Sequence, residues 1–140
     1  MTAGAKHIIQ ESIAIAFILL FTYTGINKLM ERDRFLYSLA HSPALAPLSG
    51  LISYLIPLIE VALAFFLILP RYRKNAFQLS VLLMLAFTLY IGLMLIFSTE
   101  LPCSCGGVIS KLSWEQHFVF NIVFLLMGIV GLRFTSYSQA

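Results

Sequence analysis

Four long apolar stretches restrict the fold of this chain more than any other feature. They cover about residues 8–30, 48–69, 76–97 and 114–134. Each is close to the roughly 20 residues that a helix needs to cross the hydrocarbon core of a bilayer. A membrane-spanning segment must satisfy its backbone polar groups internally, as helices do, and the alternation of barrel strands over about 10 residues is absent. The sequence therefore predicts an all-α integral membrane protein, a bundle of four transmembrane helices.

The composition agrees with this class and excludes others. Hydrophobic residues make up 60% of the chain and charged residues 11%, whereas soluble domains carry about 25% charged residues. The net charge is only +3, and no basic stripe is interleaved with aromatic residues, which argues against a nucleic-acid partner. We expect residues 1–140 to form a single membrane domain, because the chain is too short for a second one.

The connections between the stretches predict how the protein lies in the membrane. Four crossings place both termini on one side. The short basic loop "PRYRKN" (residues 70–75) is expected in the cytoplasm, because short loops rich in Lys and Arg stay there. Both termini are then cytoplasmic, and the connection over residues 98–113 faces outward. We expect a multi-pass protein of the bacterial cytoplasmic (inner) membrane, with this loop in the periplasm, where disulfides persist.

The first connection has a helical pattern of its own. Phe35, Leu36 and Leu39 recur at helical spacing, which predicts a short helix at the membrane interface.

The outward loop contains "LPCSCGG", with Cys103 and Cys105 as the chain's two cysteines. A C-x-C disulfide closes a small ring and is strained, and strained disulfides tend to be the labile, catalytic ones. Lys111 and His117 are close in sequence, and a cation at either position would favour the thiolate. A disulfide that only pins the loop, or two inert thiols, fits the spacing equally well. A metal site is less expected, because zinc motifs normally separate their cysteines by two or more residues.

A single cysteine pair also limits the mechanism. Membrane thiol oxidases that relay a disulfide from a partner to quinone generally use two pairs. This pair would therefore exchange directly with the thiols of a partner, or pass electrons to a bound quinone or to a partner subunit.

Ionisable residues inside the stretches are candidates for function. Glu60 lies about midway through the second stretch, where a carboxylate is expensive and marks either a functional site or a specific packing contact. Pro57, one turn earlier, favours a bend beside a cavity. Lys28 lies near the outer end of the first stretch, where snorkelling to the headgroups is its simplest role. The alternative is a contact with Glu60, which would have to bridge a difference in depth of a few turns between the two residues.

The fourth stretch begins with two further polar side chains. His117 and Asn121 are four residues apart and therefore share one helix face. We expect that polar face to point into the bundle, although His117 also suits an ordinary interfacial position.

Several of these motifs together resemble the MauE/DoxX-like superfamily of small four-helix membrane proteins. They are "GINKL" (residues 25–29), "PLIEVALAF" (residues 57–65), and "CSCGG" followed by "LSWEQHFVFN". The cysteine loop is similar to that of the MauE-like, redox-associated branch. The resemblance implies that Cys103 and Cys105 are the redox pair, and that Glu60, Lys28 and His117 are polar positions of the fold. MauE-like proteins are associated with disulfide formation during maturation of periplasmic redox enzymes. DoxX relatives are linked to quinone-dependent sulfur oxidation.

Three hypotheses for function follow. The first is a membrane thiol–disulfide redox protein that supports disulfide formation in, or maturation of, a periplasmic partner. The second is a non-enzymatic subunit or assembly factor of a larger inner-membrane complex, whose cysteines only shape a loop. The third is a quinone-binding oxidoreductase subunit, which requires a pocket inside the bundle near Glu60. The sequence leaves open whether the chain is an enzyme.

Overall fold

A computed structural model describes residues 2–41, 45–97 and 114–138 of the chain. Within these residues the structure is helical and contains no strand. The described part has four helices that are long and apolar enough to cross a membrane. These are α1 (Ala3–Met30), α3 (Ser49–Ile68), α4 (Arg73–Phe97) and α5 (Trp114–Ser138). The prediction of an all-α membrane protein with four transmembrane helices is confirmed.

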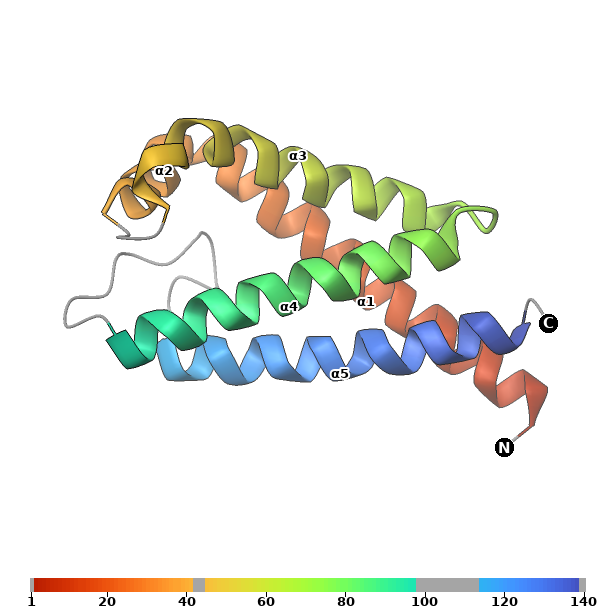
Figure 1. Cartoon of the computed structure of the whole chain (residues 1–140). Helices are drawn as coiled ribbons and strands as arrows, with labels where there is room; N and C mark the ends of the chain where they lie inside the picture. The colour runs from red at the N-terminus through yellow and green to blue at the C-terminus, as the bar shows by residue number, and fades with distance from the viewer. Residues whose placement is uncertain (1, 42–44, 98–113, 139–140) are drawn as a thin grey trace.

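The four helices form two pairs joined side by side. α1 packs most extensively along α3, and α4 along α5, while α1 also contacts α5. The two ends of the chain lie at one end of the bundle, as an even number of crossings requires (Figure 1). α2 (Arg32–Ala40) lies at the opposite end (Figure 1). Which end faces the cytoplasm stays a prediction.

The first connection folds back onto the bundle. The short helix predicted from the spacing of apolar residues is present as α2, and Phe35 and Leu39 are its buried residues. They are four residues apart, so they share the face that α2 packs against α3. The 3-10 helix η1 (Ala46–Leu48) then leads into α3. This end of the bundle is therefore built from α2, η1 and the first turns of α3.

The centre of the bundle is an aromatic cluster around Phe17. This side chain of α1 is fully buried, and its ring centroid lies 5.5 Å from Phe21, 6.2 Å from Phe77 and 5.4 Å from Phe124. Gly128 of α5 makes room for it, because a Cβ there would lie 3.1 Å from the Phe17 ring. Small residues at helix contacts let backbones approach closely in membrane bundles. The core is thus centred where α1, α4 and α5 meet, and α3 adds Leu63, Ala64 and Leu67 to it.

The end that carries the termini is fastened by polar contacts. Arg73 forms an ion pair with Glu11 of α1 and donates a hydrogen bond from Nε to the carbonyl oxygen of Leu67, at 3.1 Å. Gln10 donates to Thr135 Oγ1 at 3.1 Å, which joins α1 to α5. These contacts tie all four long helices together at this end.

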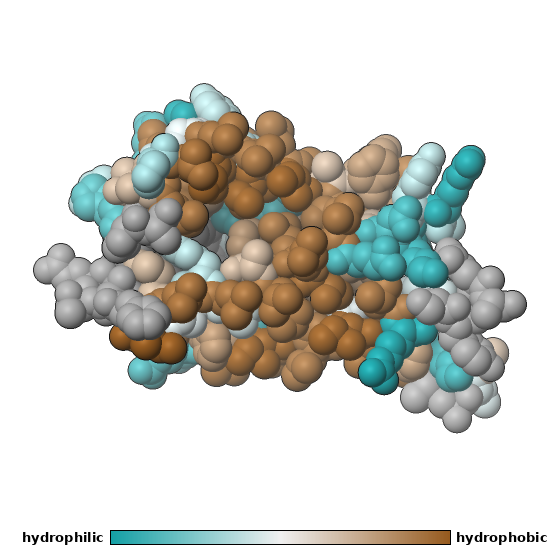
Figure 2. Space-filling model, in the orientation of Figure 1, coloured by the Kyte–Doolittle hydropathy of each residue, from teal (hydrophilic) through white to brown (hydrophobic). Residues whose placement is uncertain are grey.

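The outer surface is that of a lipid-facing bundle. On α4, large apolar side chains three or four residues apart form an exposed row, which we call the lipid-facing strip. The strip consists of Leu82, Leu85, Leu89, Leu93 and Ile96. Apolar side chains cover the middle of the molecule and hydrophilic ones gather toward its two ends (Figure 2). Contiguous apolar surface of this kind needs a bilayer around it.

Candidate functional site

A buried ion pair between α1 and α3 is the central feature of the site. Lys28 Nζ donates to Glu60 Oε1 over 2.7 Å, and the two side chains are only 7% and 1% exposed. Thr24 Oγ1 lies 3.3 Å from the same carboxylate oxygen and 2.9 Å from the carbonyl oxygen of Leu20, and its single proton is shared between these two acceptors. Thr24 and Lys28 are four residues apart, so one face of α1 supplies both donors.

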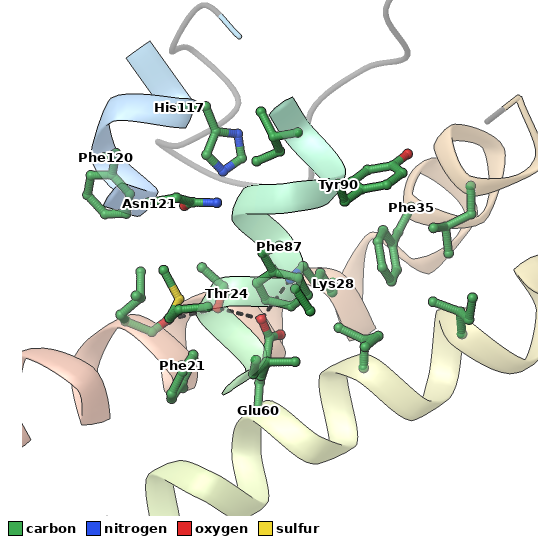
Figure 3. A pocket seen from close by; sticks show the side chains of 18 of the residues that line it. Phe21, Thr24, Lys28, Phe35, Glu60, Phe87, Tyr90, His117, Phe120 and Asn121 are labelled. Carbon is green, nitrogen blue, oxygen red and sulfur yellow. Dashed lines mark hydrogen bonds and ion pairs between the residues drawn. The ribbon is translucent and has the colours of Figure 1, made fainter. Parts of the chain in front are cut away.

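The snorkelling role expected for Lys28 from the sequence is therefore wrong, and the alternative, a contact with Glu60, is confirmed. Its ammonium points inward to Glu60 instead of outward to the headgroups (Figure 3). The sequence suggested that Lys28 and Glu60 lie a few turns apart in depth. In the structure α1 and α3 are offset along their axes, and this offset brings the two residues together. Gly25 of α1 lies level with Glu60 of α3, so the first turns of α3 extend beyond the end of α1, where α2 packs against them.

Gly25 makes this close contact of α1 with α3 feasible. A Cβ at this position would lie 2.9 Å from Val61 Cγ2, 3.2 Å from the carbonyl oxygen of Pro57 and 3.3 Å from Glu60 Cβ. A side chain at this position would force Val61 to move and would press tightly against the Pro57 carbonyl and Glu60. Gly25 thus sets the helix separation at which Lys28 reaches Glu60.

Aromatic rings surround the ammonium group. Nζ of Lys28 lies 4.8 Å from the ring centroid of Phe87 and 5.5 Å from that of Phe35. Cations are attracted to ring faces within about 6 Å. Two helices that do not carry the ion pair, α2 and α4, thereby help to hold the lysine in place.

The carboxylate keeps one acceptor without a partner. Glu60 Oε2 is buried and has no hydrogen-bond partner among the described residues. Buried polar atoms are normally hydrogen-bonded, and an exception calls for an explanation such as a ligand or a functional proton. The Lys28–Glu60 pair therefore leaves one buried acceptor, Glu60 Oε2, to be satisfied by a ligand or a proton.

An apolar cavity of about 270 Å³ adjoins the pair. An apolar cavity of about 150 Å³ is enough to hold benzene, so this one has room for a substituted six-membered ring. Five aromatic side chains contribute to its wall: Phe21, Phe35, Phe87, Tyr90 and Phe120. The polar groups in the lining are few, and they converge from α1, α3 and α5 (Figure 3). This combination is typical of ligand sites.

Four residues singled out from the sequence meet at this cavity. Lys28 and Glu60 line it from α1 and α3, and His117 and Asn121 line it from α5 (Figure 3). Asn121 is buried and His117 is half-buried, so the polar face of α5 turns into the bundle. Cys103, Cys105 and Lys111 lie outside the described residues.

Other lining residues were not identified from the sequence. Thr24 carried a usable signal, because it is four residues before Lys28 and thus on the same helix face. Phe87 and Tyr90 belong to a uniformly apolar stretch, and no periodic pattern distinguishes a cavity wall from ordinary packing there. Among the described residues, no group of three or more His, Cys, Asp or Glu side chains is placed to hold a metal ion.

The fold and the site together define a small four-helix membrane protein with a buried ion pair at an internal apolar cavity. The family model of the methylamine utilisation protein MauE matches residues 6–134, and the chain belongs to this family. This match does not show a link to the DoxX proteins, so that likeness stays a resemblance. Neither a curated protein nor a solved structure matches the chain.

Proposed function

We propose that this protein is a membrane thiol–disulfide redox protein that supports disulfide formation in a partner outside the cytoplasmic membrane. The observation that carries the proposal is the C-x-C pair, Cys103 and Cys105, in the connection between α4 and α5. The helices on either side of this connection contribute Tyr90 and His117 to the cavity wall. Membership in the MauE family supports a membrane accessory role.

The proposed reaction is thiol–disulfide exchange, and the oxidised pair is itself the oxidant. A thiolate of the partner attacks one sulfur of the Cys103–Cys105 disulfide and forms a mixed disulfide. The partner's second thiolate then attacks this bond, so that the partner gains a disulfide and the pair leaves as two thiols. Two electrons and two protons move from partner to pair. We propose that Lys111 favours the thiolate by its positive charge.

The proposed location follows from the charge of one turn. The turn between α3 and α4 carries Arg71, and α4 begins with Arg73 and Lys74. These basic residues lie at the same end of the bundle as the termini (Figure 1). We propose that this end is cytoplasmic, because short loops rich in Lys and Arg stay inside. The cysteine connection, at the opposite ends of α4 and α5, then faces the periplasm of a bacterial inner-membrane protein, in an oxidising compartment.

Thiol trapping in cells tests the exchange. Cells are quenched with acid, and free thiols are labelled with a maleimide polymer before and after reduction. We expect the wild-type chain to gain two labels only after reduction. The Cys103→Ser/Cys105→Ser variant should lose partner oxidation, whereas Ser104→Ala, which changes the residue between the cysteines, should keep it.

The same experiment separates this function from that of a structural subunit. A pair that stays reduced in cells, or a double-serine variant that still supports a fully oxidised partner, contradicts the redox function. Stable co-purification of a complex with the double-serine variant would then favour an assembly role.

A further inference from the structure

The cavity beside the ion pair has the chemistry of a site for a neutral polar head. Lys28 and Glu60 form a pair with no net charge, so the site has no excess charge to offer an ionic group. An ammonium has three protons to donate, and Lys28 Nζ uses one on Glu60 Oε1. Glu60 Oε2 is a buried acceptor without a partner in the described part of the chain. The site therefore offers a donor and an acceptor side by side.

The walls fit a flat ring. Phe87 and Phe35 flank the ammonium, and Phe21, Phe120 and Tyr90 complete the aromatic lining. Aromatic rings pack well against one another in offset or edge-to-face arrangements. The volume of about 270 Å³ exceeds the roughly 150 Å³ that holds benzene, which leaves space for ring substituents.

The cavity reaches the outer surface between α3 and α4. These helices are joined by a short turn at one end and diverge toward the other (Figure 1). The lining includes Ile52 and Ile56 of α3, and Leu83 and Ala86 of α4. Ala86 is exposed and lies one turn from Leu82, beside the lipid-facing strip. Hydrophilic surface is visible between the apolar side chains of α3 and α4 (Figure 2). A ligand would therefore enter from the bilayer with its apolar part toward the lipid.

We propose that this cavity binds the head of a membrane quinone, which enters from the bilayer between α3 and α4. Lys28 donates to a carbonyl oxygen of the quinone form. Glu60 Oε2 accepts from a hydroxyl of the quinol form, so the unpartnered atom gains its hydrogen bond. Ile52, Ile56 and Leu83 contact the start of the isoprenoid tail.

The role of the quinone as an electron acceptor rests on the proposed thiol–disulfide function. After exchange with the partner, Cys103 and Cys105 are two thiols and must be oxidised again. They form their S–S bond by losing two electrons and two protons. A quinone takes up both electrons and both protons, one proton on each oxygen, and becomes a quinol. The single cysteine pair then suffices, because it passes its two electrons directly to the quinone with no second pair in between.

Photolabelling of the full-length protein in lipid nanodiscs tests binding separately from thiol chemistry. The probe is an azido-substituted benzoquinone with a decyl tail, and unlabelled decyl-benzoquinone is the competitor. We expect saturable labelling of peptides from α1, α3 or α4 that the competitor removes. The Cys103→Ser/Cys105→Ser variant should bind equally well. If it binds but the thiol-trapping experiment fails, the redox function is wrong and the quinone site stands.

Two tryptophan substitutions on the exposed side of α4, at Ala86 and at Leu82, form a matched pair. Ala86→Trp fills the opening of the cavity, whereas Leu82→Trp lies one turn away and does not line it. Both are on the exposed side of α4, so neither disturbs the core. Ala86→Trp should weaken quinone binding by about tenfold or more, and Leu82→Trp should leave it unchanged. Glu60→Gln should weaken binding of the reduced form, decyl-benzoquinol, by about tenfold, the loss expected for a hydrogen bond to a charged group, because only the quinol donates to Glu60 Oε2.

Three outcomes overturn the quinone site. Labelling that does not saturate shows that the probe only partitions into lipid. Equal binding by Ala86→Trp and Leu82→Trp shows that the quinone lies elsewhere. Native mass spectrometry that finds a retained phospholipid, lost in Ala86→Trp and not displaced by decyl-benzoquinone, assigns the cavity to a lipid instead.

Discussion

At the scale of single residues, the Lys28–Glu60 pair is the most informative contact. Both side chains are almost fully buried, at a depth where an ionisable residue is expensive and usually functional. Replacing both members of a buried pair by apolar residues is often neutral, whereas removing one partner leaves the other charge without compensation. The pair therefore predicts how the free energy of unfolding changes when one or both residues are replaced.

Lys28→Met should destabilise the protein strongly, by about 3 kcal/mol, because it leaves Glu60 buried without its cation. The double variant Lys28→Met/Glu60→Met should regain most of that loss. Thermal unfolding in one detergent measures both. Equal destabilisation by Lys28→Met and by the double variant would contradict the idea that the uncompensated Glu60 carboxylate is what destabilises Lys28→Met.

Gly25 makes the second prediction at this scale. Gly25→Val should destabilise the contact of α1 with α3 by about 1–3 kcal/mol, since overpacking forces a backbone shift. Its new side chain would meet Val61 and the backbone oxygen of Pro57. It should also weaken quinone binding by separating Lys28 from Glu60.

Gly50→Val serves as the control for Gly25→Val. Gly50 lies in the first turn of α3, and a Cβ there meets nothing within 4 Å. A comparable unfolding temperature for the two valine variants would contradict the role of Gly25 as the close-contact residue.

At the scale of helices, apolar length and helical spacing predicted most of what the structure contains. The four spans follow from stretches of about 20 apolar residues, and α2 from the spacing of Phe35 and Leu39. The offset of α1 against α3 could not be predicted, because it depends on Gly25 and on how α2 packs, which are tertiary contacts. The residues of α4 that line the cavity could not be predicted either, because a uniformly apolar helix has no pattern that separates lipid-facing from cavity-facing residues.

The packing of α2 gives a prediction at the same scale. Leu39 is buried and lines the cavity, and it holds α2 against the bundle with Phe35. Leu39→Ala should cost about 2–5 kcal/mol and loosen the cavity. Hydrogen exchange should rise in α2 while the α4–α5 pair keeps its protection. Uniform loss of protection in all helices would contradict a local role for this contact.

At the scale of the whole molecule, the two ends of the bundle differ in character. One end holds the termini, the Glu11–Arg73 ion pair and the basic turn. The other holds α2, and the connection with both cysteines joins α4 to α5 there. The redox proposal requires the second end to face the oxidising side of the membrane.

Cysteine labelling tests this orientation in the Cys103→Ser/Cys105→Ser background. Arg34→Cys places a thiol on α2, and Arg71→Cys places one in the basic turn; both positions are exposed. A membrane-impermeant maleimide added to intact spheroplasts should label Arg34→Cys but not Arg71→Cys. Permeabilised spheroplasts should label both. The reverse pattern would place the cysteine connection in the cytoplasm.

The most direct measurement of the central claim is a covalent trap of the partner. With either Cys103→Ser or Cys105→Ser, the remaining thiol can form a mixed disulfide that the missing cysteine no longer resolves. Acid-quenched membranes, separated without reductant and identified by mass spectrometry, should show one such variant joined to a partner outside the cytoplasm, in a band that reductant removes. Absence of any adduct with both variants, together with a normally oxidised partner in the double-serine strain, would contradict thiol–disulfide exchange.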